Sequence, residues 1–191
     1  MTDLAERRGM ETAVYQPAED SNLLAEAAVD HVDPDDLVLE VGTGSGYVAD
    51  LVAERTGARV VASDVNPHAC RQARERGLDV VRADLVAPFR DGSLDVVLFN
   101  PPYLPTVPEE ARDDWMEVAL SGGESGREVV DPFVDDVGRV LAPDGVVLLL
   151  VSSLTGVDAV VERAAERGFS AVALVDESFP FETLTVLKLV R

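Results

Sequence analysis

The sequence predicts one α/β domain built on a doubly wound, mostly parallel sheet with a C-terminal antiparallel hairpin. Apolar runs rich in β-branched residues alternate with helical patterns along the chain. The early runs are continuously apolar, which is typical of parallel strands covered on both faces. The last two runs are joined by a short turn at Pro180, with no helix between them. The length of 191 residues favours a single domain, residues 1–191.

Strands are predicted wherever an apolar, β-branched run is bounded by turn residues. These runs are Leu37–Val41, Arg59–Ser63, Asp79–Arg82, Leu94–Phe99, Val146–Ser152, Ala171–Val175 and Thr183–Val190. Parallel strands joined by helices have right-handed crossovers, and ligands bind at the carboxyl edge of such sheets.

Helices are predicted between the strands from apolar residues at helical spacing. They cover Ala18–Val32, Gly46–Arg55, Pro67–Glu75, Gly126–Leu141 and Val157–Arg167. The charged stretch VPEEARDDWME, residues 107–117, is interpreted as a solvated segment.

The composition is strongly acidic, with 36 Asp and Glu against 16 Lys and Arg and a net charge of −20. Lys188 is the single lysine. Such acidity disfavours nucleic acid partners, because like charges repel. An Asp-rich, Lys-poor chain is also typical of salt-loving organisms, since molar salt shortens the Debye length to about 3 Å. We attribute the acidity to solvent adaptation.

Several classes of protein are not expected from this composition. The chain has no apolar run of membrane-spanning length and no apolar leader at its start, so a cytoplasmic protein is expected. With 1 Cys and 2 His, neither an internal disulfide nor a metal site is expected.

A glycine loop joins the first predicted strand to the next helix. The spacing is E-x-G-x-G-x-G from Glu40, with glycines at Gly42, Gly44 and Gly46. A dinucleotide fingerprint would have glycine at position 47, where this chain has Tyr47. The loop therefore predicts close approach of a ligand, but not of a dinucleotide.

Three carboxylates lie at neighbouring strand ends, namely Glu40, Asp64 and Asp84. Together they favour a cationic ligand without phosphates, such as S-adenosylmethionine with its sulfonium and ammonium groups. The alternative is that each aspartate only caps the helix that follows it.

The stretch LDVVLFNPPYLP ends a buried strand on a rigid turn. The side-chain oxygen of Asn100 and the carbonyl of Pro101 can accept hydrogen bonds from both N–H groups of a planar nitrogen. Tyr103 offers a face on which a planar group can stack. This arrangement predicts methyl transfer to an amide or an exocyclic amine, and the alternative is a turn with no role beyond rigidity.

With these motifs, the chain resembles the HemK family of class I methyltransferases, which have a Rossmann-like fold with a seven-stranded sheet. It is most similar to the archaeal and eukaryotic branch that methylates glutamine in translation release factors. The similar segments are VYQPAEDSNLL, LEVGTGSG, ASDVNP, FNPPY and SGGESGREVVD, and they span nearly the whole chain. Gln16 stands where many relatives have Glu.

The resemblance implies a role for each candidate residue. The methionine part of the cofactor contacts Glu40, Gly42 and Gly44, its ribose Asp64, and its adenine amine Asp84. The remaining cofactor residues are Thr43, Gly46, Val65, Leu85 and Asn100, with Glu19, Asp20 and Ser21 closing over the cofactor from an N-terminal helical cap, residues 1–35. The expected catalytic residues are Asn100, Pro101 and Tyr103. The expected substrate contacts are Asn100, Pro102, Tyr103 and Trp115, although Trp115 can equally serve local packing.

The resemblance also implies two protein partners. The substrate would be a class I release factor, methylated at the glutamine of its Gly-Gly-Gln loop. A small zinc-binding activator subunit would form an obligate heterodimer with this chain. The predicted strand in Leu78–Leu85 should lie at a sheet edge, and exposed edges favour pairing with another chain.

Two other functions remain open at this point. The NPPY motif also occurs in enzymes that methylate the N6 amine of adenine in DNA or RNA. Those enzymes need a basic groove, and this sequence has no arginine cluster near Asn100. The chain could also be a catalytically silent binding subunit, which the intact Asn100–Tyr103 motif disfavours.

Overall fold

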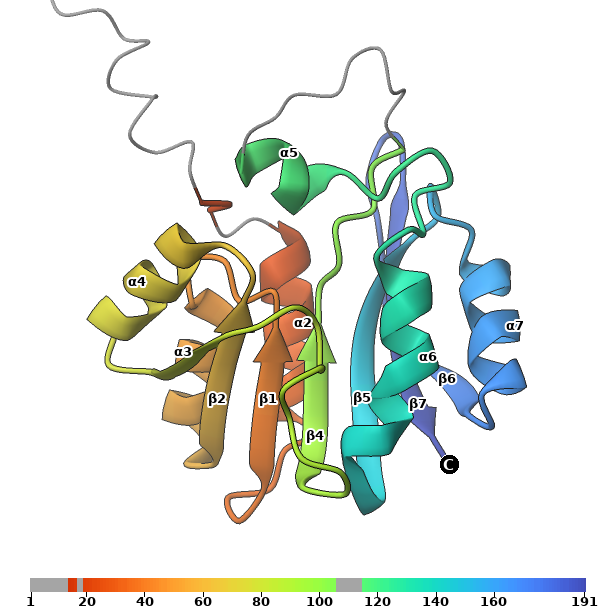
Figure 1. Ribbon diagram of the computed structural model, residues 1–191. Helices are drawn as coiled ribbons and strands as arrows, with labels where there is room; N and C mark the ends of the chain where they lie inside the picture. Colours follow the sequence, from red (N-terminus) through yellow and green to blue (C-terminus); the bar gives the residue numbers. More distant parts are fainter. Residues whose placement is uncertain (1–13, 17–18, 106–114) are drawn as a thin grey trace, which may run out of the picture.

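The protein is described from a computed structural model that covers residues 14–16, 19–105 and 115–191. Its strands are β1 (Leu37–Val41), β2 (Arg59–Asp64), β3 (Asp79–Arg82), β4 (Leu94–Phe99), β5 (Leu141–Ser152), β6 (Ser170–Ser178) and β7 (Thr183–Val190). They form a 7-stranded sheet in the order β3-β2-β1-β4-β5-β7-β6 (Figure 1). Strands β1 to β5 pair in parallel, and β7 is antiparallel to both β5 and β6. The predicted fold class, including the C-terminal hairpin, is confirmed.

Strand β5 differs most from its predicted bounds, because it begins at Leu141 instead of Val146. Leu141 pairs with Leu94, and the register then shifts before Val96 pairs with Val146. The turn residues Asp144 and Gly145 therefore lie within an irregular first part of the strand, which the sequence alone presents as a loop.

The helices are α2 (Glu19–Val29), α3 (Tyr47–Thr56), α4 (Pro67–Glu75), α5 (Trp115–Leu120), α6 (Val130–Val140) and α7 (Val157–Glu166). The prediction that the fourth helix starts at Gly126 is wrong, because Gly126 has a φ of +71° and belongs to a turn. The last three residues of the predicted solvated stretch, Trp115 to Glu117, form the first half of α5. The rest of that stretch, residues 107–114, lies outside the described residues.

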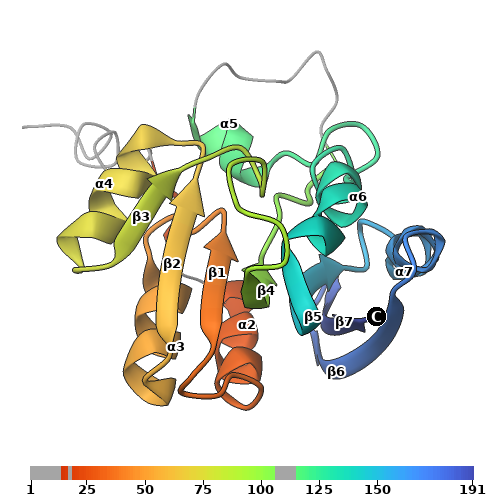
Figure 2. The same cartoon turned by 60° about the horizontal axis from the view of Figure 1, so that its bottom comes forward.

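Helices cover both faces of the sheet (Figure 2). The buried apolar side chains form two core clusters, one on each face. In one core Phe133 of α6 packs on Phe99 of β4, with ring centroids 4.5 Å apart. The other core contains Leu24 of α2 and Val52 of α3. The adjacent residues Leu98 and Phe99 enter opposite cores, as expected for a strand covered on both faces.

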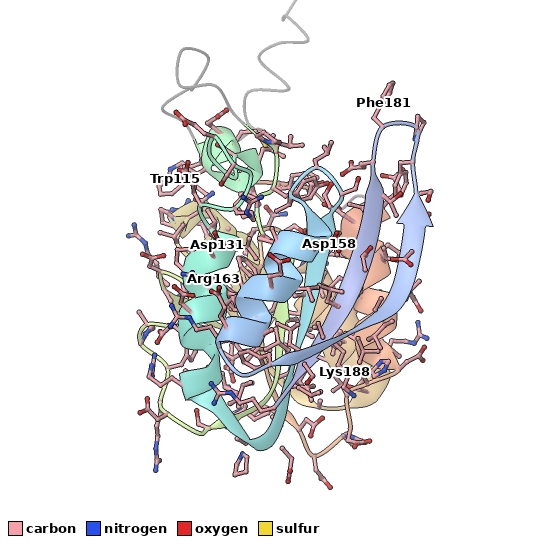
Figure 3. The ribbon with its side chains drawn as sticks, turned by 90° about the vertical axis from the view of Figure 1, so that its right-hand side faces the viewer. Trp115, Asp131, Asp158, Arg163, Phe181 and Lys188 are labelled. Carbon is pink, nitrogen blue, oxygen red and sulfur yellow. The ribbon has the colours of Figure 1, made fainter. Side chains whose placement is uncertain are left out.

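The carboxyl ends of β1, β2 and β4 point toward the end of the molecule where α5 lies (Figure 1). The tip of the β6–β7 hairpin lies at the same end of the molecule, and Figure 3 labels both Phe181 of this tip and Trp115 of α5 in the upper part of the view. The hairpin is tied to the end of β5, where the Ser152 hydroxyl donates to Glu182 Oε2 at 2.6 Å. The strand ends and α5 therefore frame the candidate site.

In the helices of the described residues, no stretch is both long and apolar enough to cross a membrane.

Candidate active site

A cavity of about 270 Å³ lies at the carboxyl ends of the central strands. Most of the sequence-predicted site residues line it: Asp20, Ser21, Glu40, Gly42, Thr43, Gly44, Asp64, Val65, Asp84, Leu85, Asn100, Pro102, Tyr103 and Trp115. Glu19, Gly46 and Pro101 lie outside the lining. Glu19 is exposed, whereas Gly46 and Pro101 are buried behind the wall.

The glycine loop after β1 follows a path that side chains would obstruct. Gly42 and Gly44 have φ values of +64° and +54°, which disfavour residues with a Cβ. A Cβ on Gly42 would lie 3.3 Å from the Phe99 ring, and one on Gly44 would lie 3.4 Å from the carbonyl oxygen of Tyr15. The loop backbone is thereby exposed to the cavity.

Glu40 is buried beneath this loop, at 4% exposure. Its Oε2 accepts hydrogen bonds from the Thr43 hydroxyl at 2.5 Å and from the Ala49 N–H at 3.0 Å. Burial raises the pKa of Glu40 to about 8, although both hydrogen bonds oppose the shift. The side chain thus ties the end of β1 to the glycine loop and to the first turn of α3.

Asp64 at the end of β2 makes a second set of ties to the loop backbone. Its Oδ2 accepts from the Gly44 N–H at 2.9 Å and its Oδ1 from the Asn66 N–H at 2.8 Å. Burial raises the pKa of Asp64, and the backbone hydrogen bonds counteract the rise. Each carboxylate oxygen keeps further acceptor capacity for a ligand hydroxyl.

The segment after β3 carries a strained residue next to the third carboxylate. Leu85 has a φ of +47°, the single positive φ of a non-glycine residue in the described chain. A leucine in this region costs about 1–2 kcal/mol. Asp84 before it is exposed, and both residues line the cavity.

Asn100 follows β4, which lies next to β1 in the sheet. Its Nδ2 donates to Asp20 Oδ2 at 3.1 Å. Its Oδ1 is buried and has no hydrogen-bond partner among the described residues. A buried acceptor without a donor is uncommon in folded proteins, and it is the kind of atom that a bound substrate satisfies.

The turn that follows Asn100 is supported by the glycine-rich segment between α5 and α6. Leu104 exchanges backbone hydrogen bonds with this segment, donating to Leu120 and accepting from Gly122, at 3.0 and 2.9 Å. A Cβ on Gly126 would lie 2.9 Å from the carbonyl oxygen of Tyr103. The segment SGGESG therefore holds the NPPY turn at backbone contact, which accounts for the glycine at Gly126.

Tyr103 is half-buried, and burial raises the pKa of its phenol well above the usual range, with Asp20 and Glu182 adding to the effect. Its hydroxyl therefore stays protonated throughout the physiological range, so that an uncharged aromatic side chain borders Asn100.

The sequence interpretation missed several parts of the cavity wall, among them Tyr15 and most of helix α5. Tyr15 lines the cavity and donates from its hydroxyl to Asp20 Oδ2 at 3.0 Å. Helix α5 contributes Val118, Ala119 and Leu120 besides the predicted Trp115. Tyr15 lies in the quoted segment VYQPAED, but a single tyrosine before a helix carries no spacing signal. Gln16, beside it, donates to the Val14 carbonyl at 3.2 Å.

The charge of the lining fits a cationic ligand. Four of the lining side chains are acidic, although the raised pKa of Glu40 keeps that one protonated at neutral pH, and the described lining contains no Lys, Arg or His. A dinucleotide phosphate would meet repulsion here, whereas a sulfonium or ammonium group would be attracted. The chemistry of the donors thus fits S-adenosylmethionine.

Comparisons with known proteins agree with this geometry. A family model described as a methyltransferase domain matches residues 38–123. MJ0928 of Methanocaldococcus jannaschii, named as a protein N5-glutamine methyltransferase, is 37% identical, covering 91% of this chain and 90% of the relative. The human methyltransferase HEMK2 is 33% identical, covering 96% of this chain and 92% of its own.

A similar solved structure is the E. cuniculi Mtq2–Trm112 complex, described as responsible for the methylation of the eRF1 translation termination factor. One of its chains superposes with a TM-score of 0.78 at 33% identity, covering 94% of this chain and 99% of that one. At lower identity, 16%, a chain from a complex of the Haloferax volcanii Trm112 activator shares the fold with a TM-score of 0.60.

The sheet order, the glycine loop and the acidic cavity together define a class I methyltransferase that uses S-adenosylmethionine. The chain belongs to the HemK family, in the archaeal and eukaryotic branch that includes MJ0928 and HEMK2.

Proposed function

We propose that this chain methylates the side-chain amide nitrogen of a glutamine, in the Gly-Gly-Gln loop of a class I translation release factor. The observation that carries the proposal is the buried Oδ1 of Asn100, which has no partner among the described residues although its residue lines the cavity. A primary amide supplies the N–H donor that this oxygen lacks. The names of the relatives, which refer to protein glutamine and to eRF1, support the same acceptor.

The proposed cofactor contacts follow from the lining. Asp64 would hold the ribose hydroxyls, Asp84 the adenine amine, and the loop from Gly42 to Gly44 the methionine part. Thr43, Val65 and Leu85 would complete the site, and Ser21 would close it from α2 as part of an N-terminal cap. Gly46 and Glu19 lie outside the lining. Gly46 would contribute only by shaping the backbone of the glycine loop, and Glu19 only as the first residue of α2.

The chain's own residues would prepare the acceptor nitrogen. S-adenosylmethionine, when bound, supplies an electrophilic methyl group on a sulfonium. Asn100 Oδ1 would accept one N–H of the acceptor amide and the Pro101 carbonyl the other, which aims the nitrogen lone pair and weakens its resonance with the amide carbonyl. Tyr103 and Pro102 would hold the flat amide group, and Trp115 would border the entrance. Positioning of this kind can lower a barrier by several kcal/mol.

We also propose that a small zinc-binding activator subunit covers the β3 edge, near Leu78–Leu85. The sheet order supports this, because β3 is an edge strand of the described sheet. Val81 on β3 and the nearby Val65 are exposed apolar side chains. The Mtq2–Trm112 complex supports a small activator as the kind of partner.

The activator proposal is tested by a pair of substitutions at the two edges of the sheet. Val81→Asp should abolish co-elution with an archaeal activator subunit in molar KCl, since it places a charge in the proposed interface. Val172→Asp, on the opposite edge strand β6 and also exposed, should leave co-elution unchanged. Equal behaviour of the two variants would contradict the assignment of the edge.

The reaction itself is tested by transfer of labelled methyl from S-adenosylmethionine. The acceptors are an archaeal release factor with Gln or with Ala in its Gly-Gly-Gln loop, each with and without the activator, in molar KCl. Label on the Gln form alone is the expected result. Label on an adenine-containing oligonucleotide instead would favour an N6-adenine methyltransferase, and bound cofactor with no label on any acceptor would favour a silent binding subunit.

A further inference from the structure

Asp20 is a buried carboxylate in the first turn of α2, with 5% of its surface exposed. The donors around it are divided between its two oxygens. Oδ1 accepts from the Ser21 N–H at 2.6 Å and from the Ser21 hydroxyl at 3.3 Å. Oδ2 accepts from the Tyr15 hydroxyl at 3.0 Å and from Asn100 Nδ2 at 3.1 Å. Asp20 thus lies between the start of α2 and the residue that follows β4.

An asparagine amide fits its site in two orientations of nearly equal shape, and the neighbours decide between them. Asp20 offers only acceptor atoms to Asn100. The orientation with Nδ2 toward Asp20 makes a hydrogen bond, whereas the flipped one would set Asn100 Oδ1 against a carboxylate oxygen. Asp20 therefore directs Oδ1 to the other side, where it is buried without a described partner.

We propose that Asp20 is a positioning residue that fixes the amide orientation of Asn100, in place of the cofactor contact that the sequence predicts for it. The inference rests on the proposed function, since it matters only if the acceptor brings an N–H to Asn100. With the amide flipped, Asn100 would present an NH₂ group to the N–H of the acceptor, and two donors would face each other. The orientation set by Asp20 thus decides whether the acceptor is bound productively.

The variant Asp20→Asn tests this because it places a donor NH₂ group where Asp20 has an acceptor oxygen, and the side chain keeps its shape. The strong Ser21 N–H donor requires an acceptor, so the new amide oxygen takes the Oδ1 position. Its NH₂ group then faces Tyr15 and Asn100, and Asn100 must turn its own oxygen toward position 20 to accept from it. In Asp20→Ala no group demands either orientation, so Asn100 can rotate to suit the acceptor.

The proposal therefore predicts that Asp20→Asn, which keeps the shape of the side chain, lowers kcat more than Asp20→Ala, which removes it. With the wild-type complex methylating the release factor in molar KCl, Asp20→Asn should lower kcat about 100-fold and Asp20→Ala only about 10-fold. The dissociation constant for S-adenosylmethionine, measured by calorimetry, should stay within about twofold of wild type in Asp20→Asn. Glu26→Gln, an exposed acid-to-amide change on the same helix, should leave both quantities unchanged.

A spectroscopic measurement tests the same point without turnover. The side-chain NH₂ resonances of Asn100, assigned by their loss in Asn100→Asp, report the partner of Nδ2 in a ¹H–¹⁵N spectrum. We expect them to move in Asp20→Asn and to stay in place in Glu26→Gln. A merely structural role of Asp20 would not single out these resonances from those of its other neighbours.

Several results would overturn the proposal. One is wild-type kcat in Asp20→Asn. Another is a loss of cofactor affinity in proportion to the loss of kcat, which would make Asp20 a cofactor contact. Greater damage in Asp20→Ala than in Asp20→Asn would indicate a packing role. If the wild-type protein transfers no methyl to the release factor, the proposed function fails, and the Asn100 resonances still decide whether Asp20 orients the amide.

Discussion

The two halves of the cavity differ in how their polar atoms are satisfied. In the half formed by β1 and β2, Glu40 and Asp64 accept hydrogen bonds from backbone N–H groups of the glycine loop and the following helices. In the half formed after β4, Asn100 Oδ1 is buried without a partner in the described chain. The polar side chains Glu40 and Asp64 of the first half therefore have hydrogen-bond donors within the protein, whereas Asn100 Oδ1 of the second half has none in the described chain.

This difference separates stability from activity. A buried polar atom that lacks its hydrogen bond costs about 1–3 kcal/mol, so the β4 half is less stable without a ligand than with one. No buried side-chain oxygen or nitrogen described in the β1–β2 half lacks a partner, so the organisation of this half does not depend on a ligand. We therefore expect substitutions in the β1–β2 half to affect unfolding, and substitutions in the β4 half to affect methyl transfer.

The largest effect is expected for Asn100→Ala, which removes the unpaired acceptor itself. Methyl transfer should fall about 10²–10³-fold, by analogy with the loss of one hydrogen-bonding group that acts in a transition state. Cofactor affinity should remain within about twofold, because the glycine loop and its carboxylates are intact. The matched control is Asn22→Ala on the exposed face of α2, which should keep full activity. Unchanged turnover in Asn100→Ala would remove Asn100 from the reaction.

A large effect on stability is expected at the start of α3. Gly46 has a φ of +81°, and an added Cβ would lie 3.1 Å from Ala73 and from Leu78. Gly57, at the other end of the same helix, has a φ of +77° but no atom within 4 Å of such a Cβ. Gly57→Ala should cost about 1–2 kcal/mol for the backbone alone, and Gly46→Ala about 1–3 kcal/mol more for the crowding.

Denaturant unfolding of the two variants in molar KCl measures this difference. Equal losses in Gly46→Ala and Gly57→Ala would mean that α4 moves aside at no cost, and the β1–β2 half would then be less rigid than its hydrogen bonds indicate.

A smaller effect, on activity, is expected where the glycine-rich segment supports the NPPY turn. Gly126→Ala places a Cβ 2.9 Å from the Tyr103 carbonyl, so the turn must shift. A displacement of this size should lower kcat about 10-fold and leave cofactor affinity unchanged. Gly168→Ala, with a similar φ of +83° and no atom within 4 Å, controls for the backbone cost and should keep wild-type kcat. A matching loss in both variants would assign the effect to stability instead of to the turn.

Those parts of the fold that depend on local patterns could be predicted from the sequence. The bounds of β1, β3, β4 and β7 match the prediction. For β1 and β4 the reason is that strands buried on both faces are almost continuously apolar, whereas β3 is a largely exposed edge strand and its match does not rest on burial. The start of α6 was placed too early, since the apolar stripe from Val129 onward says nothing about the turn at Gly126. Helix α5 was missed because its sequence continues a charged stretch and has no buried residue of its own.

The candidate site divides in the same way. The glycines and carboxylates after β1, β2 and β3 could be placed together, because parallel strands bring their carboxyl ends to one edge. The hydrogen bond between Asp20 and Asn100 could not be predicted, since it joins residues 80 positions apart through side-chain geometry alone. The same holds for Tyr15, whose position depends on the path of the chain before α2.

The smallest effect that distinguishes the two halves is a pH dependence of stability from Glu40. The folded protein holds the Glu40 proton up to a pKa of about 8, whereas an unfolded glutamate releases it near 4.5. Between these values the folded state binds more protons than the unfolded state, so stability falls as pH rises, by about 1.4 kcal/mol per pH unit from this group. Below pH 4.5 and above pH 8 this contribution is constant.

Glu40→Gln should remove that slope and little else, because the glutamine oxygen can still accept from Thr43 and Ala49. The difference in unfolding free energy, variant minus wild type, should therefore increase by about 1.4 kcal/mol from pH 6 to pH 7. Denaturant unfolding in molar KCl measures it. Glu54→Gln, at an exposed position of α3, controls for the change in net charge and should run parallel to the wild type. Parallel curves for Glu40→Gln as well would mean that Glu40 is ionised at neutral pH. The β1–β2 half would then hold a buried charge that its hydrogen bonds stabilise, and it would no longer be the half that is complete without a ligand, because a cationic cofactor would be needed to balance it.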